Sequence, residues 1–181
     1  MQYVTFFRGG TLVSLNPGRV EQADLVVADG RIVKKGGRLA PPPGAEIVDV
    51  RGRIILAGLV DAHVELPGAY ASVLPHVDAA ALENAQTDES VVCAVFSAAL
   101  EAVRAGVTTL VVRNISPSCA EGSLIRVRDV LATLGIRFAA SYGVSDLALA
   151  PGGADGLVEA RMAAAFGAAP RMRYLLGAAP L

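Results

Sequence analysis

The chain has 181 residues, of which 53% are hydrophobic and 18% charged, and its formal net charge is −1. This length allows one compact domain with a small companion but excludes a complete eight-stranded α/β barrel, which needs roughly 200 to 250 residues. The low charged fraction indicates either that another chain covers part of the surface or that abundant alanine inflates the hydrophobic count. Scattered basic residues and near-neutral charge argue against nucleic-acid binding.

Neither a secretory signal nor a membrane span is expected from the sequence. Residues 1–10 lack the charged-then-apolar pattern of a secretory signal, and no apolar run reaches the 18 or so residues of a membrane span. Cys93 and Cys119 have no metal-ligand spacing and suit a reducing compartment. We therefore expect a cytoplasmic protein.

Short apolar runs separated by turn residues predict a small antiparallel β-sandwich module over residues 1–53. Asp29-Gly30 between two such runs is a strong hairpin signal. The expected strands cover residues 11–13, 23–27, 31–33 and 46–50, with a further turn at 16–18 and breaks at 36–37 and 41–43.

From residue 54 onward, strands and helices are expected to alternate. The continuous apolar run 54–60 is typical of a strand buried on both faces. Thr87 is a plausible N-cap and Gly106 a stop signal, so 88–105 should be helical. Further strands are expected at 107–112, 136–142 and 172–176, further helices at 121–134 and 155–166, and a loop at 66–86. Strand–helix–strand crossovers imply parallel strands, so the predicted fold class is α/β, with a partial TIM-like barrel of about four strands over residues 54–181.

The first barrel strand ends in polar residues that could form a site. Side chains alternate along a strand, so His63 and Glu65 share one face and could hold one cation. Alone, such a histidine is more often an ordinary surface residue.

The segment 55–66, with Asp61 and His63, resembles the signature of the amidohydrolase superfamily, in which a Pro-Gly-hydrophobic-Asp-x-His-x-His run supplies two metal ligands. The resemblance is closest to the chlorohydrolase and deaminase branch, particularly the SsnA-like aminohydrolases, and implies a metal-dependent hydrolase acting on non-peptide C–N or C–Cl bonds. It also rests on stretches 100–109, 115–124, 135–138 and 141–146, and on the first module, whose segments 28–32 and 48–52 are similar to the family's N-terminal sandwich.

The chain departs from the family's pattern where metal ligands and site residues are expected, leaving His63 as the one residue that resembles a ligand. Glu65 replaces the second histidine, and Gly143 stands where a glutamate would follow the third strand. The other vestigial positions are Asp61, Arg113 and Asn114 (the last two in place of an Asp-His-His run), and Ala179 in place of a third histidine.

These departures predict a retained scaffold that has lost its chemistry. Turn glycines such as Gly106 and Gly135 persist while the polar site residues are lost. Random decay would remove scaffold glycines and site residues alike. A catalytic zinc usually needs three protein ligands and an open fourth position. We therefore expect no bound cofactor, with Zn²⁺ or another divalent metal held only if a partner completes the site. Glu65 is expected to pair with Arg113 instead.

Other polar residues have simpler interpretations. His76 could approach the barrel mouth, but an exposed loop histidine is favoured. Ser116, Ser118 and Cys119 lack a suitably placed base and are interpreted as turn and cap residues.

Three functional hypotheses follow. The first is a non-catalytic protein that pairs with itself or with a full-length amidohydrolase-like protein, because an open half-barrel exposes its edges. The second is the front part of a longer metal-dependent hydrolase or deaminase, or one subunit of a split one. The third is a protein that binds a small molecule in the pocket that the family uses for its substrate, without turnover.

Overall fold

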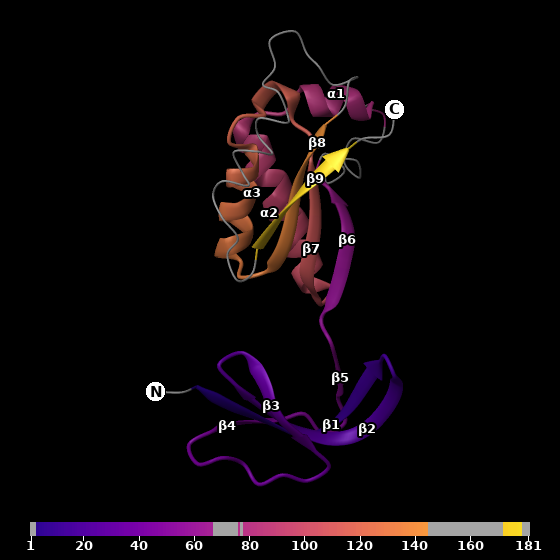
Figure 1. The fold of residues 1–181 in the computed structure, drawn as a ribbon, viewed down its shortest axis with the longest axis vertical. Coiled ribbons are helices and arrows are strands. Elements are labelled where there is room, and N and C mark those ends of the chain that lie inside the picture. The colour runs from indigo at the N-terminus through magenta and orange to yellow at the C-terminus, as the bar shows by residue number, and fades with distance from the viewer. Residues whose placement is uncertain (1–2, 67–75, 77, 145–171, 179–181) are drawn as a thin grey trace. The chain divides into compact units, whose positions relative to one another are not determined.

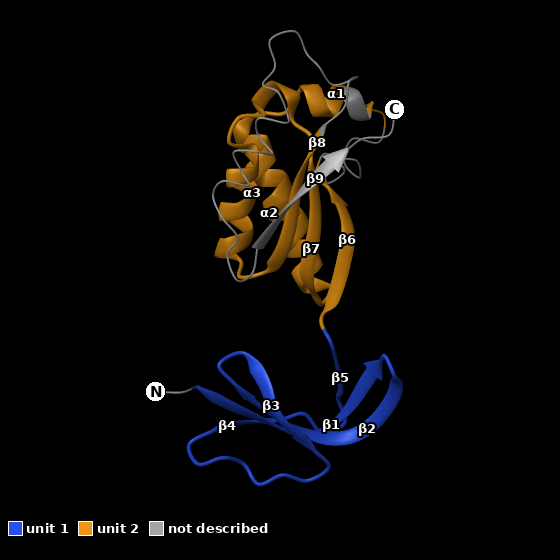
Figure 2. Cartoon of the chain, viewed as in Figure 1, with its two compact units in different colours: residues 1–57 blue, residues 58–181 orange. Residues whose placement is uncertain are grey.

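The computed structural model describes residues 3–66, 76, 78–144 and 172–178, and divides the chain into two compact units, residues 1–57 and 58–181 (Figure 2). The expected helix at 155–166 and Ala179 lie outside the described residues. Of the helices described, none is long and apolar enough to cross a membrane.

The first unit is a mixed β-sheet in the order β3-β2-β1-β4, with β5 also paired to β1 (Figure 1). The β1–β2 and β2–β3 pairs are antiparallel, as predicted, but β1 runs parallel to both β4 and β5. The sheet is mixed rather than antiparallel because the segment after β3 returns the chain alongside β1 in the direction of β1. The strands are β1 (Val4–Leu15), β2 (Gly18–Ala28), β3 (Arg31–Gly36), β4 (Glu46–Asp49) and β5 (Ile54–Leu56).

The predicted β2–β3 hairpin is formed. Asp29 and Gly30 both have positive φ, 49° and 74°, which is the backbone geometry that Asp-Gly supplies in a tight hairpin turn.

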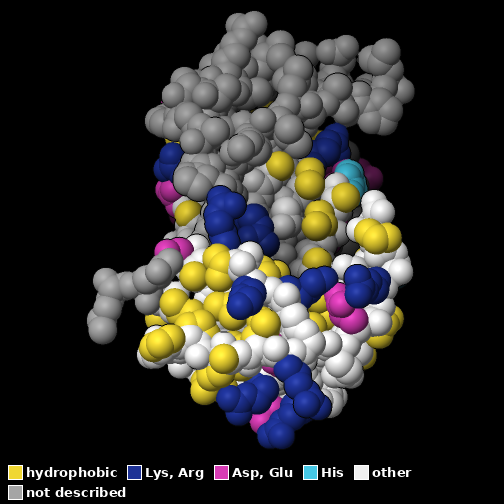
Figure 3. All heavy atoms as spheres, turned by 60° about the horizontal axis from the view of Figure 1, so that its bottom comes forward, with side chains coloured by type: hydrophobic (Ala, Val, Ile, Leu, Met, Phe, Trp, Pro, Cys, Tyr) yellow, Lys and Arg dark blue, Asp and Glu magenta, His cyan; other side chains and the backbone are white. Residues whose placement is uncertain are grey.

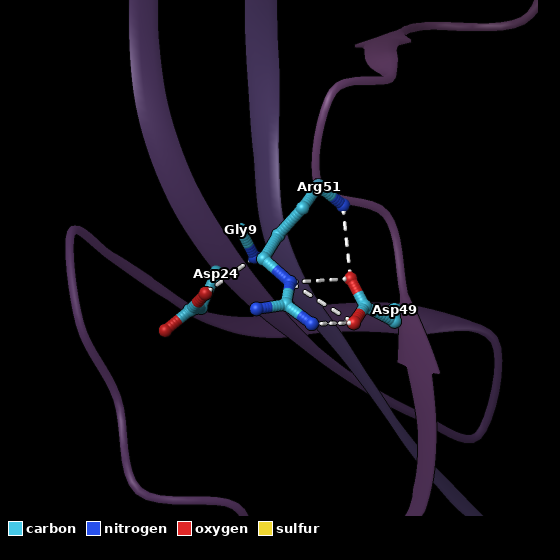
Figure 4. A network of polar contacts seen from close by, with 4 residues as sticks. All are labelled: Gly9, Asp24, Asp49 and Arg51. Carbon is cyan, nitrogen blue, oxygen red and sulfur yellow. Dashed lines mark hydrogen bonds and ion pairs between the residues drawn. The ribbon is translucent and has the colours of Figure 1, made fainter.

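A buried carboxylate ties the first unit together (Figure 4). Asp24 accepts a hydrogen bond from the backbone N–H of Gly9 at 2.7 Å. It also accepts one from the backbone N–H of Leu39 at 2.8 Å. Gly9 has φ 74° at an irregularity in β1, and the side chain of Arg51 fills the space where a Cβ would stand. Arg51 donates in turn to Asp49, which lowers the pKa of that carboxyl to about 2.

The first unit exposes many large apolar side chains, and Figure 3 shows hydrophobic groups gathered among lysines and arginines on the face turned to the viewer. A small sheet with one layer has too few elements to bury them all. The most exposed are Tyr3, Leu15, Val20, Ile32, Val33, Ile54 and Leu56.

The second unit is a parallel sheet in the order β6-β7-β8-β9, with helices on one face (Figure 1). This confirms the α/β class and the four parallel strands. Its strands are β6 (Leu59–Glu65), β7 (Val107–Asn114), β8 (Arg137–Val144) and β9 (Met172–Ala178), and its helices are α1 (Ala79–Asn84), α2 (Asp88–Arg104), the 3₁₀ turn η2 (Pro117–Cys119) and α3 (Ser123–Thr133).

The boundaries of α2 have a clear local cause. Thr87 accepts from the backbone N–H of Ser90, and Ser90 accepts from the N–H of Thr87, which completes a capping box. Gly106 follows the helix with φ 82°, as a C-terminal stop requires.

The predicted continuous strand 54–60 is wrong. The run divides at Ala57 and Gly58, so its first part is β5 of the first unit and its second part opens β6. Hydrophobicity alone does not mark where a chain leaves one sheet and enters another.

The core of the second unit lies between the sheet and α2 and α3. Successive residues of β7 face opposite sides, so Leu110, Val112 and Asn114 are buried toward the helices. Other buried members are Leu66, Val91, Val95, Ala99, Leu124, Val127, Leu131, Phe138, Ala140 and Tyr142.

Candidate functional site

Glu65 and Arg113 occupy the carboxyl ends of neighbouring strands. They are Cα partners in the β6–β7 ladder, and Arg113 Nη1 donates to Glu65 Oε1 at 2.6 Å. The Arg113 side chain is 20% exposed and that of Glu65 47% exposed. The ion pair expected from the sequence is therefore formed, and it is partly shielded from water.

His63 lies beside this pair. Its Nε2 is 3.5 Å from Glu65 Oε1, and its side chain is 72% exposed. Its backbone N–H donates to Asp61 Oδ1 at 3.2 Å, at a point where the β6–β7 register is irregular. The structure thus brings together three of the residues singled out in the sequence, His63, Glu65 and Arg113.

Gly143 lies against the same arginine. A Cβ at this position would stand 2.9 Å from Arg113 Nε and 2.6 Å from Ile115 Cγ1, closer than real contacts allow. The space that a larger residue would need on β8 is filled by these two side chains.

Asn114 does not join this cluster, although it is the neighbour of Arg113 in sequence. It is buried on the helix-facing side, where its Nδ2 donates to Ser116 Oγ at 3.0 Å. The backbone N–H of Ser116 donates to the Tyr142 hydroxyl at 3.2 Å. Both contacts hold the turn that follows β7, so Asn114 has a structural role.

Glu83 is a neighbour of this site that sequence reasoning missed. It lies on α1, within the segment expected to be a loop, and burial raises the pKa of its carboxyl while nearby Arg113 opposes the rise and Glu65 adds to it. The helix-forming run of residues 79–83, three alanines, a leucine and a glutamate, is the signal that could have revealed α1.

The remaining candidates lie elsewhere. His76 is exposed, in agreement with the favoured interpretation. Ser116 is the N-cap residue of η2, and Ser118 Oγ donates to the carbonyl of Gln86. Burial raises the pKa of the Cys119 thiol, which lowers its reactivity.

A cavity of about 420 Å³ opens between β6 and α2. Its polar lining is acidic, with Asp61, Glu65 and Glu101 alongside His63. Small apolar residues form the rest of the lining: Val64, Ala98, Ala102, Ala105 and Val107.

The described residues do not fit a catalytic zinc. Among them, no group of three or more His, Cys, Asp or Glu side chains is placed to hold a metal ion. The two possible metal ligands are His63 and Glu65. Glu65 already forms an ion pair with the guanidinium of Arg113, whose positive charge also opposes a cation at this point. A metal would need three protein ligands, and here one imidazole is left.

The chain resembles known proteins in sequence over part of its length, although no family model matches it. It is 37% identical to a dihydroorotase from Pelotomaculum thermopropionicum over 59 residues, which are 33% of this chain and 14% of that protein. It is 30% identical to dihydropyrimidinase 2 of Caenorhabditis elegans over 118 residues, which are 65% of this chain and 19% of that protein.

Solved structures share the fold over nearly the whole chain. Atrazine chlorohydrolase from Arthrobacter aurescens, complexed with zinc, has a TM-score of 0.75 at 18% identity and is matched over 98% of this chain and 47% of its own. Escherichia coli guanine deaminase has a TM-score of 0.68 at 16% identity, with 94% and 44% covered.

These similarities support the resemblance to the amidohydrolase superfamily and include a chlorohydrolase and a deaminase. The chain spans less than a fifth of these two sequence relatives and less than half of these two solved chains.

Proposed function

We propose that this chain is an amidohydrolase-like protein that does not carry out metal-dependent hydrolysis by itself and acts as a structural or partner-binding subunit. The observation that supports this most strongly is the ion pair between Glu65 and Arg113 beside Gly143. Arg113 places a fixed positive charge next to the carboxylate of Glu65, which a metal ion would otherwise use as a ligand.

The physical argument concerns the activation of water. A bound divalent cation lowers the pKa of water from about 15.7 to about 7, which produces hydroxide at neutral pH. His63 and Glu65 alone hold such a cation weakly, and the second of them is neutralised by Arg113. The remaining scaffold can bind another polypeptide without this chemistry.

The experiment is a turnover assay on the purified chain with added zinc. Dihydroorotate, dihydrouracil, guanine and atrazine sample the substrate classes that the relatives' names indicate. No turnover above the buffer rate is expected. Turnover that His63→Ala abolishes and the control His76→Ala retains would contradict the proposal.

A second candidate function rests on the 3.5 Å approach of His63 to Glu65. If a partner chain supplied further ligands and displaced Arg113, these two residues would contribute to a shared hydrolytic site. Zinc uptake by the mixture of this chain and a full-length amidohydrolase-like protein, beyond the sum of the two alone and lost in His63→Ala, would favour this candidate.

A further inference from the structure

Helix α2 carries apolar side chains on two sides. Its core side, which includes Val91, Val95 and Ala99, is buried against the rest of the second unit. A surface helix usually carries polar and charged residues opposite its core-facing stripe. On the outer side of α2, however, four large hydrophobic side chains are each between 37% and 48% exposed: Val92, Phe96, Leu100 and Val103. An exposed apolar stripe of this kind marks a surface that binds a partner.

Most of these outer residues follow the spacing of a coiled-coil seam. Cys93, which is also exposed, begins a series that continues at steps of three, four and three residues through Phe96, Leu100 and Val103. We call these four residues the outer seam. Alternate steps of three and four keep side chains in one line along a helix, where they pack between the side chains of a facing helix. The outer seam therefore suits a second helix.

The two ends of α2 carry opposite charges. Glu89 lies in its first turn and Arg104 in its last. Neither forms an ion pair with another described residue. An antiparallel copy of α2 would place its basic end beside the acidic end of the first helix, whereas a parallel copy would place like charges together. Antiparallel helices also oppose their dipoles, which favours this direction further.

We infer that a second copy of this chain packs its α2 antiparallel against this one, with the two outer seams facing each other across a two-fold axis. Phe96 then contacts the partner's Leu100, Cys93 contacts the partner's Val103, and the axis repeats both contacts. The charges at the ends of the helix select a second copy as the occupant, because α2 is complementary to itself only in this direction.

This inference rests on the proposed partner-binding function and names both the partner and the surface. A contact between two helices of 17 residues is smaller than a standard protein interface. The dimer is therefore expected to be weak, with a dissociation constant in the micromolar range.

The first test is the solution mass as a function of concentration. Sedimentation equilibrium on the purified chain is expected to give its mass of 18.6 kDa in dilute solution. At about 100 micromolar the mass should approach twice that value, as for a weak interface. A chain that remains monomeric at this concentration would overturn the inference and leave the outer seam to a different polypeptide.

A matched pair of variants locates the contact. Phe96→Glu places a charge in the middle of the outer seam, whereas Val20→Glu places the same charge at an exposed apolar residue of the first unit. Phe96→Glu is expected to raise the dimer dissociation constant by at least about tenfold and Val20→Glu to leave it unchanged. Equal dissociation constants for the two variants would also overturn the inference.

Disulfide trapping tests the direction of the helices. In the antiparallel pair Cys93 lies opposite the partner's Val103, and the two Cys93 residues are about 15 Å apart along the helix axis, which is ten residues at 1.5 Å each. Val103→Cys is therefore expected to give a disulfide-linked dimer under mild oxidation, and the wild type is not. Val103→Cys combined with Cys93→Ser keeps Cys119 and should also give none. A linked dimer in the wild type, or none in Val103→Cys, would contradict the antiparallel pair.

These results separate from those of the turnover assay. A metal-free, inactive monomer overturns the pairing and leaves the loss of hydrolysis standing. An active, metal-loaded dimer does the reverse.

Discussion

Arg113 donates to Glu65 across 2.6 Å, although the two residues lie 48 positions apart in the chain. The contact depends on the parallel ladder between β6 and β7, which places the two residues opposite each other. It is the structural feature that most clearly distinguishes this strand-end cluster from a set of metal ligands.

Removing the guanidinium should both weaken the fold slightly and expose Glu65 to a cation. Arg113→Met is expected to lower the free energy of unfolding by about 1 kcal/mol, since the pair is partly exposed. It should also increase the affinity for Zn²⁺, because the carboxylate loses its positive partner. Urea denaturation and zinc titration measure the two effects.

Arg137→Met is the control for that variant. Arg137 lies on the adjacent strand β8 and has hydrogen bonds to Thr109 and Thr108 at 3.5 Å. Its replacement should leave zinc affinity unchanged. An equal gain in affinity for both variants would mean that Arg113 does not block the cation.

Gly143 should tolerate no side chain while Arg113 and Ile115 keep their positions. Gly143→Ala is expected to lower the free energy of unfolding by about 1–3 kcal/mol, the usual range for an overpacked core. Gly18→Ala, at a glycine with no atom near its would-be Cβ and no positive φ, is the comparison. If Gly143→Ala had the same urea midpoint of unfolding as the wild type, the close packing of Arg113 and Ile115 against position 143 would be refuted.

The phenol of Tyr142 should stabilise the turn after β7. Tyr142→Phe leaves the buried N–H of Ser116 without the acceptor that it has in the structure, at a cost of about 1–3 kcal/mol. Tyr3→Phe removes the hydroxyl of an exposed tyrosine and should cost less. Thermal unfolding of the two variants side by side gives the comparison, and a smaller loss for Tyr142→Phe would refute the role assigned to it.

Glu83 should make the second unit more stable in mild acid. Burial raises the pKa of its carboxyl in the folded state above the ordinary glutamate value of 4.5, so the folded state binds the proton more tightly than the unfolded state. Its contribution is fully present below pH 4.5 and declines as the pH rises through the raised pKa. Glu83→Gln should remove this decline in unfolding experiments between pH 4 and 7, and a variant with the wild-type pH profile would contradict the assignment.

The sequence predicted most of the second unit because its signals are local. Thr87, the acidic first turn and Gly106 define α2 without reference to the rest of the chain. The Glu65–Arg113 pair was also predictable, because alternation and parallel order place both at the same edge of the sheet.

What the sequence could not reveal depends on contacts between distant segments. The parallel pairing of β1 with β4 and β5, and the division of the run 54–60, are set by which sheet each segment joins. Asn114 was grouped with Arg113 as a vestigial site position, yet adjacent residues of one strand face opposite sides. Glu83 was missed because it lies on α1, in a segment that was expected to be a loop.

The central claim, that the lone imidazole of His63 leaves no hydrolytic metal site, is tested most directly by the metal content of the pure chain. Zinc is added in excess, the protein is dialysed, and the bound metal is measured by mass spectrometry. We predict far less than one zinc per chain, with the same value for His63→Ala. One tightly held zinc per chain that His63→Ala removes would contradict the account.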